Sequence, residues 1–423
     1  MPDRELREPR VNKGFFSYPS FAPKDFRRYL FSAFTGNLVL PIFSLYVPLL
    51  ALRLGASVFE IGLVGGASNA VYSFMPFVMG HFTDRRGSGR FFIISSFVLL
   101  TAVSILYILI ANPVYLIVAR IFEGVGWAML WPAIDAAISK DLSASDAKKV
   151  FSVFNITWSG AAALGPLVGS ALIFFTSIED AFFATMLILL LSAAVNIRPL
   201  LVSGRRALQE DNIPSGDRNQ EEIIGAQNLD RDEDKPKIGS VFYMASLSLA
   251  AVTSGVLFTF FAPYAKSIGL SILAVGVITF IFGLGRFIAY VATVNESVRH
   301  LLLRGDKRAR NMVLAVSLTA ISSLILIIRD PSGIAYLVAY GIAGAGMSVV
   351  FGIAQAGMIA EASRGKFGRN AGLYESSIGI GACLGPIVGG SISGNSIAIP
   401  FIVPFLGFVV YLASLPIIAR KKR

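Results

Sequence analysis

Charge is scarce in this chain. Only 15% of its 423 residues are charged, whereas 55% are hydrophobic and the mean hydropathy is +0.68. Soluble domains of ordinary composition carry about 25% charged residues, so the composition excludes an ordinary soluble fold. We therefore expect a multi-pass membrane protein whose surroundings are the lipid bilayer.

Cysteine and histidine are scarcer still, and this excludes several kinds of site. The chain has one cysteine, Cys383, and two histidines, so it supports neither a disulfide framework nor a metal cluster of thiolates or imidazoles. It has no match to the phosphate-binding loop G-x-x-x-x-G-K-[ST], so ATP is not expected to drive the protein directly. No nucleophile–base pair at membrane depth is recognisable either. We expect no enzyme activity and no bound cofactor or metal.

Uncharged runs long enough to cross a bilayer, which takes about 20 residues, recur throughout the chain. They predict an all-α fold with twelve membrane-spanning helices in two six-helix bundles. The first six are expected at 29–52, 61–80, 91–112, 113–138, 150–178 and 181–197. The second six are expected at 238–265, 267–295, 311–328 and 331–360, with two more in 376–419 separated by a turn at Gly394-Asn395.

The segments outside these runs divide the chain into domains. A tail at 1–28 precedes the first bundle at 29–203, and a basic tail at 420–423 follows the second bundle at 238–419. Between the bundles, 204–237 holds nine acids and six bases without apolar periodicity. Such a segment is typical of a disordered linker.

The excess of positive charge indicates how the chain is oriented in the membrane. The formal net charge is +11, but lysine and arginine accumulate on the cytoplasmic loops of membrane proteins. When alternate loops are assigned to opposite sides, 31 basic residues lie on one side and three on the other. We therefore expect both termini and the linker in the cytoplasm, a location in the cell membrane, and no nucleic-acid partner.

The two halves also resemble each other. ALGPLVGSAL at 163–172 returns as CLGPIVGGSI at 383–392, an offset of 220 residues. The same offset carries Arg120 to Tyr340 and Asp135 to Gln355, while 54–64 is echoed by 268–278. This repetition indicates two pseudo-symmetric bundles that arose by duplication.

A charged turn reads GHFTDRRGSGR from position 80 to 90. It resembles the signature G-x-L-A-D-R-x-G-R-[KR] that the major facilitator superfamily carries between its second and third helices. His81, Phe82 and Ser88 depart from the commonest residues, and an ordinary positively charged loop is the alternative interpretation. The residues on matching positions are Gly80, Asp84, Arg85, Gly87 and Arg90.

What this resemblance implies is a transporter that works by alternating access. The six-plus-six fold of the family would place the substrate, a small molecule, between the two bundles near the bilayer midplane. The turn would act as a gate, with Asp84 bonded to Arg90 and to the first amides of the eleventh helix. The protein is expected to act as a monomer.

The fourth helix reads R-I-F-E-G-V-G from Arg120 to Gly126 and resembles a second family motif, R-x-x-x-G-x-G. In proton-coupled members its arginine has been linked to proton transfer. Ionisable groups at membrane depth are costly and usually functional, so Arg120 and Glu123 are candidates for proton coupling. The alternative is an ion pair three residues apart that only neutralises itself. Proton transfer by Glu123 requires Arg120 to move away in one conformation.

Two glycine–proline helices resemble the family's antiporter signature G-x8-G-x3-G-P-x2-G-G. Small residues allow close helix approach and proline breaks a backbone hydrogen bond, so we expect these helices to bend or seal during transport; plain packing is the alternative. The fifth helix has lost three of the motif's glycines, whereas the eleventh matches it completely. The candidates are Gly165, Pro166 and Gly169 on the fifth helix and Gly381, Gly385, Pro386 and Gly389 on the eleventh.

Four further polar residues are placed at membrane depth or near helix ends. Arg286 is a candidate for contact with an anionic substrate or with an acid such as Glu123 or Asp135, the alternative being a structural pair. Asp135 and Gln355, at equivalent repeat positions, and Glu375, expected to open the eleventh helix, are candidates for gating or capping.

The sequence thus favours a twelve-helix transporter most similar to the drug/proton-antiporter branch, driven by a proton or other ion gradient. A uniporter or importer of a small metabolite is the alternative within transport. A non-transporting membrane receptor is the alternative from another class, although the linker is too short and polar for a receptor domain.

Overall fold

The computed structural model describes residues 25–76, 78–79, 89–139, 144–203, 239–292, 296–303, 307–360 and 367–420. The predicted linker, residues 1–24 and 421–423 of the predicted tails, and Gly80, Asp84, Arg85 and Gly87 of the charged turn lie outside these residues. Within the described residues twelve long helices form, as predicted, six in each half of the chain.

The first half forms the N-terminal bundle. Its helices are α1 (Phe26–Arg53), α2 (Val58–Tyr72), α4 (Gly89–Leu109), α5 (Pro113–Ser139), α6 (Ala144–Phe175) and α7 (Ile178–Ser203). The second half forms the C-terminal bundle, with α10 (Ser240–Ser267), α11 (Ile272–Ala292), α13 (Arg308–Ile325), α14 (Ile334–Ala360), α15 (Phe367–Ile392) and α16 (Val403–Arg420). Two short helices, α12 (Glu296–Leu303) and η1 (Ile399–Ile402), complete it.

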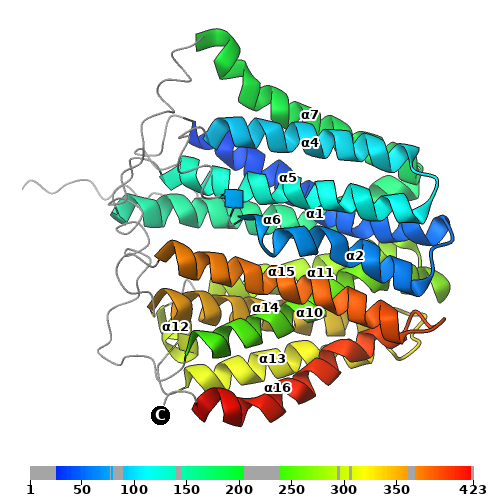
Figure 1. Ribbon diagram of the computed structural model, residues 1–423, viewed down its shortest axis with the longest axis vertical. Helices are drawn as coiled ribbons and strands as arrows, with labels where there is room; N and C mark the ends of the chain where they lie inside the picture. The colour runs from blue at the N-terminus through cyan, green and yellow to red at the C-terminus, as the bar shows by residue number, and fades with distance from the viewer. Residues whose placement is uncertain are drawn as a thin grey trace, which may run out of the picture.

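Nine of the described helices are long and apolar enough to cross a bilayer. The exceptions among the twelve long helices are α2, which has 15 residues, and the more polar α13 and α15. All three run alongside neighbours that meet the criterion (Figure 1). Length and apolarity together make this a multi-pass membrane protein.

Several predicted helix boundaries are wrong, because they were set by the ends of uncharged runs. A capping box, in which Ser57 and Glu60 bond each other's backbone N–H, starts α2 at Val58 rather than at 61. The charged residues before 150 belong to α6, and α12 lies in a segment predicted as a loop. The start of α15 at Phe367 places Glu375 two turns inside the helix, so Glu375 does not open it.

The two bundles lie one above the other in Figure 1, with their helices roughly parallel. The end of the molecule at which α1 begins and α16 finishes is called here the terminal face, and the other end the opposite face. Across the interface α2 packs on α15 and α6 packs on α11, and α1 also contacts α10. Among the described residues α5 and α14 make no comparable contact.

The repeat predicted from the sequence is also seen in the packing. A methyl group added at Gly124 of α5 would lie 2.5 Å from the Ser68 carbonyl oxygen of α2. At the equivalent Gly344 of α14 it would lie 2.1 Å from the Phe282 carbonyl oxygen of α11. These glycines of the R-x-x-x-G-x-G motif and its copy therefore allow close helix approach within each bundle.

The interface between the bundles repeats in the same way. A methyl group at Gly62 of α2 would lie 2.4 Å from the Pro386 carbonyl oxygen of α15. At Gly276 of α11 it would lie 3.1 Å from the Pro166 carbonyl oxygen of α6 and 1.7 Å from the Ser170 hydroxyl oxygen. Gly62 and Gly276 occupy matching positions of the echoed segments 54–64 and 268–278. Two pseudo-symmetric glycine-on-proline contacts thus join the bundles.

Candidate functional site

At the terminal face Arg90 is the one residue of the charged turn's motif that the structure describes. Its guanidinium is 8% exposed, and Nη2 donates to Oδ2 of Asp25 at 2.7 Å. Asp25 also pairs with Arg28 of α1. The predicted bond from Asp84 to Arg90 falls outside the described residues and stays a prediction.

Arg120 and Glu123 form the ion pair that their spacing on α5 allows. Arg120 Nη1 donates to both carboxylate oxygens of Glu123, at 2.6 and 2.7 Å. Trp127 Nε1 donates to Glu123 Oε1 at 3.0 Å, and the Tyr107 hydroxyl of α4 donates to Oε2. Arg120 Nε donates to the Val64 carbonyl oxygen of α2 at 3.2 Å. The pair therefore ties three helices of the N-terminal bundle together.

Burial sets this ion pair apart from the space between the bundles. Arg120 is 6% exposed and Glu123 only 2%, and each has partners within its own bundle. A buried charge pair needs this many hydrogen bonds to offset its loss of water. Proton exchange by Glu123 stays a prediction, and it would require several of these bonds to break.

The glycine–proline motifs pack as small-residue helices do. Methyl groups at Gly165 and Gly169 would press on α1, the first at 2.6 Å from the Leu38 carbonyl oxygen. On α15, Gly381 and Gly385 lie against the backbone of α10, and Gly389 lies against Pro400 and Phe260. The two motifs hold equivalent helix pairs within their bundles, and the carbonyl oxygens of their prolines lie against the other bundle. Bending of these helices during transport stays a prediction.

A polar cluster lies between the bundles, towards the terminal face. The Tyr72 hydroxyl at the end of α2 donates to Oε2 of Glu375 on α15, at 3.3 Å. Asp135 on α5 is exposed, and its charge interacts with that of Glu375. Gln355 on α14, the repeat equivalent of Asp135, is exposed as well. Two acids that belong to different bundles therefore face a shared space.

Arg286 of α11 provides the positive charge of this cluster. Its guanidinium lies over the ring of Trp158 on α6 at 4.7 Å and over the ring of Phe351 on α14 at 5.2 Å. Arginine on aromatic faces is held by cation–π attraction, and here the two rings come from the two bundles. Its charge interacts with Glu375, but among the described residues Arg286 forms no ion pair within 4 Å. The predicted pairing with Glu123 is absent there, because Glu123 is enclosed in the N-terminal bundle.

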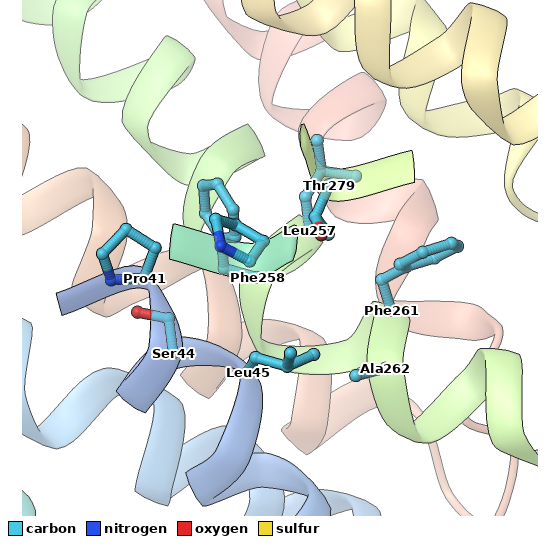
Figure 2. A pocket seen from close by; sticks show the side chains of 9 residues that line it. Pro41, Ser44, Leu45, Leu257, Phe258, Phe261, Ala262 and Thr279 are labelled. Atoms are coloured by element: carbon cyan, nitrogen blue, oxygen red, sulfur yellow. The ribbon is translucent and has the colours of Figure 1, made fainter. Parts of the chain in front are cut away.

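The space beside the cluster contrasts with the tight interface elsewhere. A methyl group at Gly352, next to Phe351, would meet nothing within 4 Å. Nearer the opposite face the bundles close on a pocket of only about 10 Å³, shown in Figure 2. Its wall includes Pro41 and Ser44 of α1 and Phe258 and Phe261 of α10. The interface is thus closely packed around this pocket, whereas Asp135 and Gln355, towards the terminal face, are exposed.

Sequence reasoning missed four residues of these two clusters, Tyr72, Tyr107, Trp127 and Phe351. Each lies next to a charged residue that was identified. No pattern in the sequence reveals Tyr72 or Tyr107, because their contacts depend on how neighbouring helices are aligned with each other. The spacing of Trp127 four residues after Glu123 was the only usable signal, since residues four apart are neighbours on a helix.

Two bundles of helices with a charged cluster in the space that they share define a membrane transporter. The protein-family comparison is consistent with this, because the model of the Major Facilitator Superfamily matches residues 29–295. The chain belongs to this superfamily. A search of curated proteins found no match.

Solved structures with the same fold are distant in sequence. The nucleoside transporter NupG shares 12% identity at a TM-score of 0.68, covering 93% of this chain and 99% of that one. A peptide transporter, POT, shares 15% at 0.67, covering 96% of both chains. A bacterial homologue of the human lysosomal transporter Spinster shares 15% at 0.63, covering 95% and 97%. These similarities establish the fold; they do not transfer a substrate.

Proposed function

We propose that this chain is a proton-coupled antiporter that exports a small solute across the cell membrane, acting as a monomer with its terminal face in the cytoplasm. The observation that carries the proposal is the pair of acids between the bundles, Asp135 on the N-terminal bundle and Glu375 on the C-terminal bundle. Alternating access changes the separation of the bundles, and so it changes how strongly two ionised acids repel each other.

Exchange follows from this repulsion. When both acids are ionised, their repulsion opposes closure of the terminal face. A proton relieves it, and so does a solute whose hydrogen-bond donors lie between the acids. Because both neutralise the same groups, proton and solute compete for the site, and competition of this kind produces antiport. Arg286, fixed by Trp158 and Phe351, balances part of the negative charge at the site.

The test has two stages. Thermal unfolding of the purified protein across a panel of metabolites and drugs identifies a solute, because a ligand of the folded state raises the melting temperature. Transport of that solute is then measured in vesicles with an imposed pH gradient. Asp135→Asn and Glu375→Gln are expected to lose gradient-driven transport and to keep solute counterflow. Gradient-driven transport at the native rate in both variants would overturn the proposal.

A matched control is available on the opposite face. Glu179 is an exposed acid that pairs with Arg53 at 2.6 Å, outside the space between the bundles, so Glu179→Gln should transport normally. The orientation is tested separately with cysteines introduced at Ser88 and Gly216 in a Cys383→Ser background. Both should react only with a reagent on the cytoplasmic side, and labelling from outside would reverse the orientation.

A further inference from the structure

The end of α2 lies directly on the acid cluster. Pro76 has no N–H to donate to the Tyr72 carbonyl oxygen, so the helix cannot continue regularly through this point. The last α-helical hydrogen bond runs from Ser73 N to Asn69 O at 2.9 Å. The next one, from Phe74 N to Val71 O at 3.3 Å, spans only three residues, as in a 3₁₀ turn. The helix α2 therefore ends at Tyr72 and turns at Ser73 and Phe74.

The same point is where α2 and α15 touch nearest to the acids. A methyl group at Gly379 would lie 2.6 Å from Cα of Ser73, so the two backbones are in direct contact. One turn along α15, Glu375 accepts the hydrogen bond from Tyr72. A joint between the bundles, a break in a helix and a hydrogen bond to a titratable group thus coincide.

We propose that Tyr72 couples the protonation of Glu375 to the joint between α2 and α15; this rests on the proposed proton coupling. An ionised carboxylate accepts a charge-assisted hydrogen bond, which is about twice as strong as a neutral one. Ionised Glu375 therefore favours the 3.3 Å contact with Tyr72, and with it this position of the broken end of α2. Protonation weakens the bond and frees the joint to rearrange as the terminal face closes.

The other groups around Glu375 set the background for this step. Among the described residues, the charged or titratable groups that act on it are Tyr72 from α2, Arg286 from α11 and Asp135 from α5. Tyr374 lies next to it in the chain and packs on Phe351. Tyr72 is the only one of these that hydrogen-bonds Glu375 in the described part of the chain, so its hydroxyl can be removed without changing any charge.

The experiment measures closure without a ligand. Spin labels are placed at Phe91 of α4 and Leu301 of α12, which are 54% and 60% exposed and lie in helices near the terminal face, in a Cys383→Ser background. In the native protein the distance between the labels should shorten as the pH falls. Tyr72→Phe removes a bond to the ionised form, so the midpoint should move to higher pH by about half to one unit.

Two further variants make the result decisive. Tyr336→Phe removes a buried hydroxyl that donates to Ile328 O at 2.7 Å, near the start of α14 and so at the end of that helix remote from Gln355, and it should leave the midpoint unchanged. In the Glu375→Gln background, adding Tyr72→Phe should not shift the pH midpoint further. An unchanged midpoint in Tyr72→Phe would overturn this inference alone. If the native distances do not respond to pH, proton coupling fails too, and with it the proposed function.

Discussion

Glu123 shows how a single buried acid can be read in two ways. At the residue scale its carboxylate accepts hydrogen bonds from Arg120, Trp127 and Tyr107, which join α5 to α4. Asp135 differs in being exposed to the space between the bundles. In the proposed mechanism, this exposure suits Asp135 to proton exchange, whereas the contacts of Glu123 suit it to hold helices together.

Glu123→Gln separates these two roles. The substitution leaves the Arg120 charge buried without its partner, so the free energy of unfolding should fall by about 3 kcal/mol. Thermal unfolding measures this loss, and transport at a range of pH values shows whether proton coupling survives. A variant of native stability that has lost gradient-driven transport would instead assign the proton step to Glu123.

At the scale of the helices, the bundles meet where backbone touches backbone. Gly62 lies on the Pro386 carbonyl and Gly276 on the Pro166 carbonyl, so the contact leaves no room for a side chain. The antiporter-like prolines therefore contribute their carbonyl oxygens to the interface. Glycines on one face of α15 contact α10, and glycines on another face contact α2.

Gly62→Ala and Gly276→Ala should therefore force the bundles apart at the contacts of Gly62 with Pro386 and of Gly276 with Pro166. Overpacking of this kind costs typically about 1–3 kcal/mol, which disfavours the described conformation relative to one that opens towards the opposite face. Spin-label distances across the opposite face should lengthen in both variants. Gly160→Ala is the control, because a methyl group there would meet nothing within 4 Å. Equal distances in all three variants would show that the contact is not limiting.

The loop before α14 offers a prediction about pH. The carboxylate of Asp330 accepts from the Ser332 hydroxyl at 2.6 Å and from Ala335 N at 2.9 Å, in the first turn of the helix. These bonds hold the pKa of Asp330 below its usual value. Its stabilising effect is thus full above the ordinary aspartate pKa of about 3.9 and is lost as the pH falls through the lower folded value. Asp330→Asn should lower the melting temperature at pH 7, with the difference from native disappearing in strong acid.

The number of long helices and the internal repeat were predictable, because hydropathy and self-similarity follow directly from the order of residues. Helix ends were less predictable. Charged residues cannot lie in lipid but extend helices into water, so α6 and α15 begin well before their uncharged runs. The partner of Glu375 was not predictable at all. It depends on the register of α2 against α15, which glycine contacts set.

At the scale of the whole molecule, the described state is one half of a transport cycle. The interface is closely packed around the small pocket of Figure 2, and Asp135 and Gln355 are exposed towards the terminal face. A molecule of this pseudo-symmetry reaches the other half of the cycle when its bundles rock about the interface. In the proposed mechanism this motion encloses the acids between the bundles, so that their protonation affects the conformation.

The most direct test of this account is the proton release that accompanies solute binding. Purified native protein in weakly buffered detergent, with a pH indicator present, is mixed with the solute found by thermal stabilisation. Competition for Asp135 and Glu375 predicts that binding releases protons from the native protein, and that the Asp135→Asn/Glu375→Gln double variant releases none. Proton uptake by the native protein, or saturating binding with no change in pH, would contradict the account.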